Sequence, residues 1–305
     1  MEKIRFGLRM REGLSLDLCR RAEELGYDAL WMGEHMLFHI PTFDALIVLA
    51  TYAARTEKIK LATGVLSLSL RHPISIAKAA GTLDVLSKGR LILGIGVGGD
   101  YPPEFEALGI PLKERGPRAD EAIALLRRLW SESGVTHDGP FFPLKEATME
   151  PKPVQPGGPP IWMAGSSDGA LRRAARLGDG IIPYPETPEF YREARRKITA
   201  WAQEAGRDIS SFTWGVFPMV QIADSYEEAR QRAAYYLKVI YPDWPDSMVD
   251  RCCIMGTLKD CIRQLEEMVK AGARYFVLAP LCTNREFPEH MDLYAREIVH
   301  YFQRV

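Results

Sequence analysis

The chain has 305 residues, of which 47% are hydrophobic, so it is long enough to bury a sizeable core. Lysine and arginine total 39 and aspartate and glutamate total 40, which leaves a formal net charge of −1 at pH 7. A balance this even creates no broad electrostatic field, and we expect neither nucleic acid nor a membrane surface as a partner.

The first third of the chain alternates short apolar runs with segments of helical periodicity. A glycine at position 26 ends the first helical segment, and Pro73 opens the third in the position where proline is favoured. The run 91–97 is apolar throughout, as expected for a strand that is buried on both faces. We predict strands over 4–9, 28–32, 59–66 and 91–97, and helices over 14–25, 43–55 and 73–86.

The alternation breaks after the fourth strand, resumes, and continues to the end of the chain. Three segments do not fit it and are predicted to be insertions, namely 98–116, 133–160 with a hairpin at VTHDGPFF, and 240–256. The remaining predicted strands are 161–164, 180–183, 213–222 and 275–279, and the remaining helices are 117–130, 168–177, 188–205, 225–239, 257–270 and 287–303.

Eight strands with helices between them predict an α/β fold of the (β/α)8 TIM-barrel type, in which chemistry takes place at the carboxyl ends of the strands. No shift in composition marks a second domain, so we expect residues 1–305 to form a single barrel domain. Five cysteines are scattered without a C-x-x-C pair and are predicted to be reduced and buried. The N-terminal segment lacks a secretion signal and no apolar run could cross a bilayer, so we expect a cytoplasmic protein.

The second predicted strand is followed by Gly33-Glu34-His35, which puts a carboxylate and an imidazole at the active end of the barrel. Histidine is the side chain best suited to proton transfer near neutral pH, so His35 and Glu34 are candidate catalytic residues. The alternative is a histidine that merely bonds the backbone at a strand end. A metal site with His39 would need a third ligand, which the neighbouring sequence does not offer.

Two glycine-containing loops are candidate cofactor sites. Gly98 and Gly99 end the run GIGVGG, which lacks the dinucleotide G-x-G-x-x-G pattern but would let a flat ring lie against bare backbone. Gly165, Ser166 and Ser167 stand where the next helix begins, and the free N–H groups of a helix N-terminus bind phosphate well. The alternative for this second loop is an ordinary serine cap.

Three segments carry a family resemblance, and they are DALWMGEH, KIKLATGVLSLSLRHPISIAKAAGTLDVLSKGRLILGIGVGG and PIWMAGSSDGALRRAARLGDGIIP. They resemble the bacterial luciferase-like monooxygenase superfamily, and most closely its branch of coenzyme F420-dependent oxidoreductases. The C-terminal GTLKDCIRQLEEMVKAGARYFVLAP is similar to the closing segment of that superfamily. The resemblance covers nearly the whole chain except the insertions.

The resemblance implies a barrel that holds a flavin or deazaflavin in its mouth and, commonly, a homodimer. It implies a non-prolyl cis peptide at Gly64–Val65 that backs the middle ring of the cofactor, phosphate binding by residues 165–167, and His35 beside the reactive carbon. Glu34 stands where this branch commonly has aspartate. The glucose-6-phosphate dehydrogenases of the branch have tryptophan at the position of His39 and glutamate directly after the glycine loop, which argues against sugar-phosphate oxidation here.

The sequence therefore predicts an oxidoreductase that moves a hydride between F420 and a small organic substrate, with His35 as acid or base. An FMN-dependent monooxygenase that uses oxygen, a non-catalytic flavin-binding protein and a metal-dependent hydrolase are the alternatives. Aromatic residues of the insertions predict an apolar-walled substrate pocket, and these residues are Tyr101, Phe105, Tyr241 and Trp244.

Overall fold

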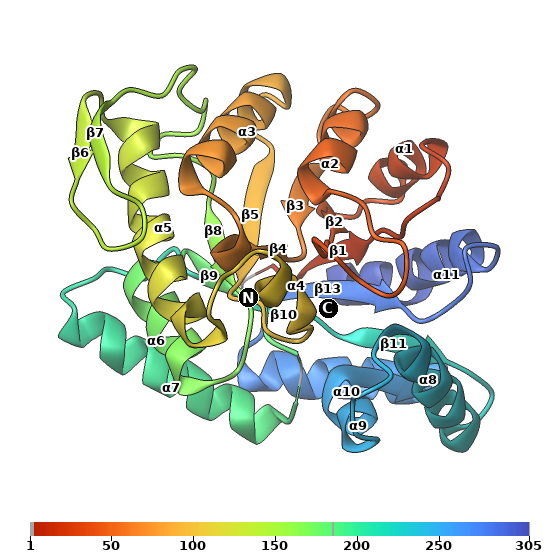
Figure 1. Ribbon diagram of the computed structural model, residues 1–305. Helices are drawn as coiled ribbons and strands as arrows, with labels where there is room; N and C mark the ends of the chain where they lie inside the picture. Colours follow the sequence, from red (N-terminus) through yellow and green to blue (C-terminus); the bar gives the residue numbers. More distant parts are fainter. Residues whose placement is uncertain (1–2, 185, 305) are drawn as a thin grey trace.

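Eight parallel strands close into a barrel in the computed structural model, which describes residues 3–184 and 186–304 (Figure 1). The barrel closes because β1 pairs with β2 on one side, Leu8 opposite Leu30, and with β13 on the other, Phe6 opposite Phe276. The predicted (β/α)8 fold is confirmed. The barrel strands are β1 (Arg5–Arg9), β2 (Ala29–Met32), β3 (Lys60–Thr63), β5 (Leu91–Gly96), β8 (Ile161–Met163), β9 (Gly180–Ile181), β10 (Thr213–Val216) and β13 (Tyr275–Pro280).

Helices surround the barrel, and two of them, α3 (Pro73–Leu86) and α6 (Asp168–Leu177), have the predicted bounds. Local capping sets these bounds, because the His72 side chain accepts the backbone N–H of Ile74 at the start of α3. The other helices of the ring are α1 (Asp17–Glu24), α2 (Ala45–Ala53), α5 (Arg115–Ser131), α7 (Pro188–Glu204), α8 (Tyr226–Ile240), α10 (Leu258–Ala271) and α11 (Phe287–Tyr294). The predicted last helix continues through a π turn (Ala295–Val299) into α12 (His300–Arg304).

Aromatic rings fill the inside of the barrel. The ring of Trp162 lies 5.4 Å from that of Trp31 and 4.8 Å from that of Tyr275, and Trp31 Nε1 donates to the Tyr275 hydroxyl at 3.3 Å. Glycine in the strands makes room for these rings, since a Cβ at Gly7 would lie 2.3 Å from Trp31 Nε1. The barrel is therefore a packed core below its mouth.

The predicted seventh strand is broken in two. Phe217 and Pro218 separate β10 from β11 (Met219–Ile222), because proline has no N–H to give to a strand ladder. Beyond the break β11 pairs with β12 (Cys253–Gly256), which lies inside the predicted insertion 240–256. The predicted third strand also ends early, at Thr63, and the Gly64–Val65 peptide bond after it is cis, as the family resemblance implied.

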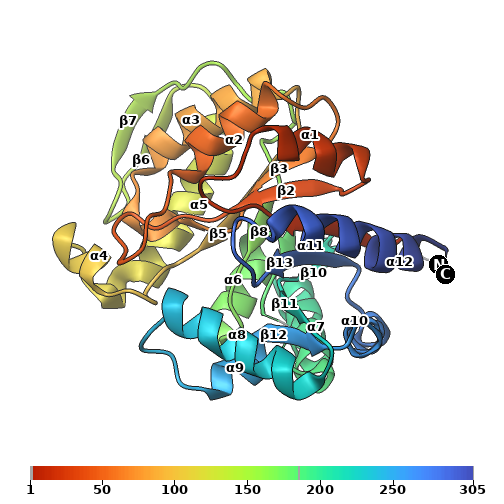
Figure 2. The ribbon, with the colours of Figure 1, turned by 90° about the vertical axis from the view of Figure 1, so that its right-hand side faces the viewer.

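The insertions carry short elements of their own. Segment 98–116 contains α4 (Pro103–Ala107) and a 3-10 turn (Leu112–Glu114), and 133–160 contains the antiparallel hairpin of β6 (Val135–His137) and β7 (Leu144–Ala147). The third segment adds α9 (Ser247–Cys252) before β12. Figure 2 shows α4 at one end of the barrel and both chain termini at the other. The insertion 98–116 thus covers the end where the strands terminate.

The sequence predicts buried, reduced cysteines and no membrane-spanning segment. All five cysteines lie in the described part of the chain, and each is buried and free of a disulfide. None of the described helices is long and apolar enough to span a membrane.

Candidate active site

His35 lies just beyond β2, at the end of the barrel that α4 covers. Its side chain is 18% exposed, and its Nδ1 is 3.2 Å from Oε2 of Glu104 in α4. Glu104 is almost fully buried, at 1% exposure. The imidazole is therefore held by a carboxylate and not by the backbone, and the carboxylate comes from the insertion 98–116.

The hydrogen bonds of Glu104 determine how His35 is held. Its other oxygen, Oε1, accepts the backbone N–H groups of Met36 and Leu37, the latter at 3.1 Å. A carboxylate with these donors acts only as an acceptor, so Nδ1 of His35 must carry the proton that it donates to Oε2. In the neutral imidazole Nε2 then has a lone pair and can take up or deliver a proton.

Glu34, the neighbour of His35 in sequence, has different partners. Its carboxylate forms a two-point ion pair with Arg71, Nε to Oε1 at 3.0 Å and Nη2 to Oε2 at 2.9 Å, and it also accepts the N–H of Ala45. Arg71 binds Asp44, the N-cap of α2, at 2.8 Å. Burial raises the pKa of Glu34, and the Arg71 guanidinium opposes that rise. The two candidate catalytic residues thus have different side-chain partners, Glu104 for His35 and Arg71 for Glu34.

A cluster of aromatic rings packs against the imidazole of His35. Phe38 stacks face to face on His35, with the ring centres 3.9 Å apart, and the edges of its ring meet Tyr101 and Tyr241. Nε2 of His39 is 3.1 Å from the carbonyl oxygen of Val239 at the end of α8. The loop after β2 is thus joined to the end of α8 by aromatic and polar contacts.

Two of the predicted aromatic wall residues pair, and one lies elsewhere. Tyr241 and Trp244 stack at 3.9 Å, and burial raises the pKa of Tyr241 to about 12, which keeps its hydroxyl neutral. The assignment of Phe105 to the pocket wall is wrong, because Phe105 is 1% exposed and packs beneath Gly98. An apolar side chain on a short helix over the barrel gains more by turning into the core than by facing solvent.

The glycines at the strand ends make room for buried aromatic rings. A Cβ at Gly64 would lie 3.1 Å from the ring of Trp31 and 3.2 Å from that of Phe217. Gly98 has φ +69°, and a Cβ there would press on the Phe105 ring at 3.2 Å. Glycine suits such positions because it has no side chain to collide with these rings.

The loop 165–167 leads directly into α6. Ser167 is the N-cap, and its Oγ accepts the N–H of Ala170 at 3.3 Å. Gly165 has φ +101°, and α6 is ten residues long. The serine cap foreseen as the alternative is thus present, and the hydroxyl hydrogen of Ser167 and the unpaired N–H groups of the first turn can still serve an anion.

Sequence reasoning missed two residues of this region, Glu104 and Arg71. A carboxylate from the segment 100–106 was a foreseeable candidate, but the sequence does not distinguish its three acids, Asp100, Glu104 and Glu106. Arg71 precedes the Pro-started helix α3 and gave no signal of its own. Within the described residues no group of three or more histidine, cysteine or acidic side chains could hold a metal ion.

These features define an enzyme of the (β/α)8-barrel class with a carboxylate-held histidine at its mouth. The sequence model of the luciferase-like monooxygenase family matches residues 15–243, and the chain belongs to this family.

Three similar proteins have three different activities. The chain is 38% identical to an F420-dependent glucose-6-phosphate dehydrogenase from Kineococcus radiotolerans over an alignment of 178 residues. This alignment covers 56% of the chain and about half, 52%, of that dehydrogenase. The chain is 29% identical to a 4-hydroxyprotoasukamycin monooxygenase from Streptomyces nodosus subsp. asukaensis, over 97% of this chain and 91% of that one. It is 26% identical to a 5,10-methylenetetrahydromethanopterin reductase from Archaeoglobus fulgidus, over 91% and 92%.

Solved structures agree on the fold. Monooxygenase RslO1 from Streptomyces bottropensis superposes with a TM-score of 0.84 at 25% identity, over 98% of this chain and all of that one. An F420-dependent secondary alcohol dehydrogenase in complex with an F420–acetone adduct gives a TM-score of 0.85 at 20% identity, over 97% and 98%.

Proposed function

We propose that this protein is an oxidoreductase that transfers a hydride between coenzyme F420 and a small organic substrate. The observation that carries the proposal is the His35–Glu104 pair just beyond β2, in which the carboxylate engages Nδ1 and not Nε2. Similarity to an F420-dependent glucose-6-phosphate dehydrogenase supports the choice of cofactor. Sugar phosphate is not proposed as the substrate, because the chain departs from those dehydrogenases at His39 and at Gly99-Asp100.

The residues of the mouth fit a deazaflavin. The backbone at Gly64, Val65, Gly98 and Gly99 would accept the flat ring, because these residues follow β3 and β5 at the carboxyl ends of the barrel strands. The loop 165–167 would hold a phosphate at the N-terminus of α6. When bound, F420 supplies the two-electron chemistry, that is, it accepts or gives up the hydride.

The protein's own contribution is proton transfer and orientation. His35 would take a proton from, or deliver one to, a substrate oxygen at Nε2, while Glu104 holds the ring in the required tautomer and stabilises its charged form. Glu34 is proposed as a positioning residue, because its ion pair with Arg71 ties the loop that carries His35 to α2. The aromatic side chains around Phe38 would exclude water and favour an apolar substrate.

An FMN-dependent monooxygenase is the second candidate. It is favoured by the alignment with 4-hydroxyprotoasukamycin monooxygenase, which extends over 97% of the chain.

A homodimer and a cytoplasmic location, which the sequence and the resemblance imply, remain proposals.

The deciding experiment is a parallel fluorescence titration of the purified protein with F420 and with FMN, followed by a screen for F420 reduction and for oxygen uptake. F420 binding that is stronger than FMN binding, with hydride transfer to or from an organic substrate, would support the proposal. Preference for FMN with substrate-dependent oxygen uptake would establish the second candidate. Binding of neither cofactor would refute both, and full turnover by His35→Ala would remove the role of His35.

A further inference from the structure

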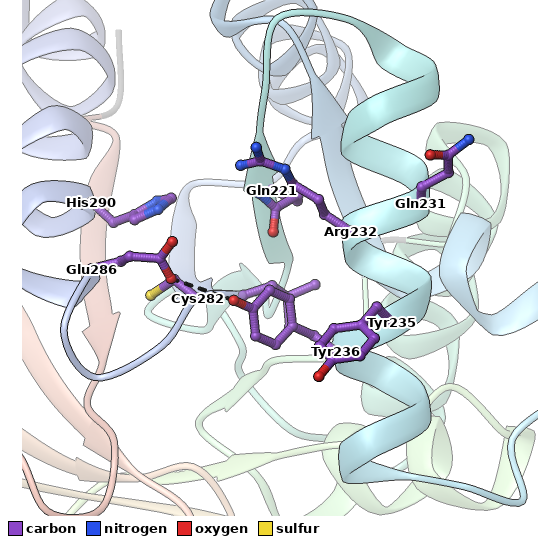
Figure 3. A pocket seen from close by; sticks show the side chains of 9 residues that line it. Gln221, Gln231, Arg232, Tyr235, Tyr236, Cys282, Glu286 and His290 are labelled. Atoms are coloured by element: carbon purple, nitrogen blue, oxygen red, sulfur yellow. Dashed lines mark hydrogen bonds between the residues drawn. The ribbon is translucent and has the colours of Figure 1, made fainter.

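A cavity of about 360 Å³ lies between α8 and α11, over strand β11 (Figure 3). Gln221 of β11 lies between the two helices, Arg232 and Tyr236 face the cavity from α8, and Glu286 and His290 face it from the other side. None of these side chains belongs to the candidate active site. Cavities of this volume are at the small end of those that bind organic ligands in proteins.

Gln221 carries a buried acceptor without a partner. The residue is 2% exposed, and its Oε1 makes no hydrogen bond within the described part of the chain. Its Nε2 donates to the carbonyl oxygen of Ile222 at 3.2 Å, which fixes the amide, because turning it over would set two oxygens against each other. A buried acceptor of this kind destabilises the fold unless a donor reaches it.

Glu286 supplies a second acceptor and a negative charge. The backbone N–H and the hydroxyl of Thr283, at 2.8 and 2.7 Å, and the hydroxyl of Tyr236, at 3.4 Å, all donate to Oε2. The two bonds from Thr283 hold the pKa of Glu286 below its usual range, so the carboxylate is ionised at neutral pH. None of these three bonds uses Oε1.

His290 supplies a third acceptor. The Tyr294 hydroxyl gives its only hydrogen to the carbonyl oxygen of Val220 at 3.1 Å, so at the 3.3 Å contact with His290 it must accept from Nδ1–H. Burial lowers the pKa of His290, against the opposing effect of Glu286, and the ring is therefore neutral at pH 7. Its Nε2 then carries a lone pair.

The positive charge of Arg232 is already paired, since its Nη2 lies 2.7 Å from Oε1 of Glu228 on the same helix.

We propose that the cavity binds a compact organic molecule that carries a primary ammonium group. An ammonium group has three N–H donors and no acceptor, which matches the three acceptors on Gln221, Glu286 and His290. The Tyr236 ring and Leu281 would contact its apolar part.

The test is calorimetric titration of the intact protein with 2-phenylethylammonium and with its N,N,N-trimethyl derivative, which keeps the charge but has no N–H donor. The variant is Gln221→Leu, which removes the acceptor at nearly constant volume. The matched control is Gln231→Leu, the same change at an exposed glutamine on the rim of the cavity. Thermal unfolding of each variant checks the fold, because Gln221→Leu removes both the unsatisfied Oε1 and the bond from Nε2 to Ile222.

We expect saturable binding of the primary amine, weakened about tenfold or more by Gln221→Leu and by trimethylation, and unchanged in Gln231→Leu. Three results would overturn the proposal: no binding of the amine at millimolar concentration, equal binding by folded Gln221→Leu, or equal binding of the trimethyl derivative. The first of these would mean that water alone satisfies Gln221. The test does not depend on F420, so its failure leaves the proposed function untouched.

Discussion

Oε2 of Glu104 lies 3.2 Å from Nδ1 of His35, although 69 positions separate the two residues in the chain. The contact links the loop after β2 to the short helix α4 in the insertion after β5. Because the carboxylate also receives two backbone N–H groups from the histidine loop, it fixes both the ring and the loop that carries it. Glu104 is therefore the residue on which the orientation of His35 depends.

Glu104→Gln should lower kcat by about 10- to 100-fold, because outer partners of a reactive histidine usually matter by that factor. Steady-state kinetics measure kcat for each variant. Glu106→Gln, an exposed acid on the same helix, is the control, and an unchanged kcat in Glu104→Gln would contradict the assignment.

Replacing Glu34 by Gln should destabilise the fold by about 2 kcal/mol, because Arg71 loses its charge-assisted bonds to Glu34 and keeps its bond to Asp44. The Glu34 side chain is 1% exposed and that of Arg71 is 18% exposed, so water can do little to compensate. Urea denaturation measures the free energy of unfolding. The double variant Glu34→Gln/Arg71→Met should recover part of the loss, and a double variant with the summed loss of both single changes would show that the two residues act separately.

Ser167→Ala and Ser166→Ala should separate the two roles of the loop before α6. Ser167 caps the helix, so its loss should cost about 1 kcal/mol of stability as well as cofactor affinity. Ser166 makes no capping bond at α6, so its replacement should weaken F420 binding at unchanged stability. Fluorescence titration measures the cofactor affinity, and thermal unfolding measures the stability. Undiminished cofactor binding in both variants would remove the loop from the phosphate site.

Glu23 links α1 to the start of β3 and makes the free energy of unfolding depend on pH. Burial alone would raise its pKa, but the backbone N–H groups of Glu57, Lys58 and Ile59 donate to its carboxylate and lower it overall. A lowered folded-state pKa contributes stability that is present above about pH 4.3, the unfolded value, and is lost as the pH falls through the folded value.

Glu23→Gln should therefore cost about 1 kcal/mol at pH 7, after allowance for solvent screening, and the difference from the parent should shrink below pH 4. Unfolding curves at a series of pH values check this. Glu24→Gln at the exposed neighbouring position is the control. A difference that stays constant with pH would show that the charge of Glu23 plays no part.

The sequence by itself determined the barrel, the end of it at which chemistry is expected, and several helix boundaries. These follow from local properties: the alternation of apolar runs with helical periodicity, and caps such as Gly26, Pro73 and Ser167 that act within a few residues. His35 was found for the same reason, because a residue that follows a barrel strand must lie at the mouth.

Only the tertiary structure decided which side chains meet. It paired His35 with Glu104 and Glu34 with Arg71, and it turned Phe105 into the core. Among the described residues it also left Oε1 of Gln221 without a hydrogen-bond donor. Such contacts join segments tens of residues apart, and their geometry depends on how the loops and helices pack, which periodicity and composition do not encode. The break of the seventh strand at Pro218 depends on both sequence and tertiary structure. Proline indicates where the strand is interrupted, but only the fold shows that β11 pairs with β12 after the break.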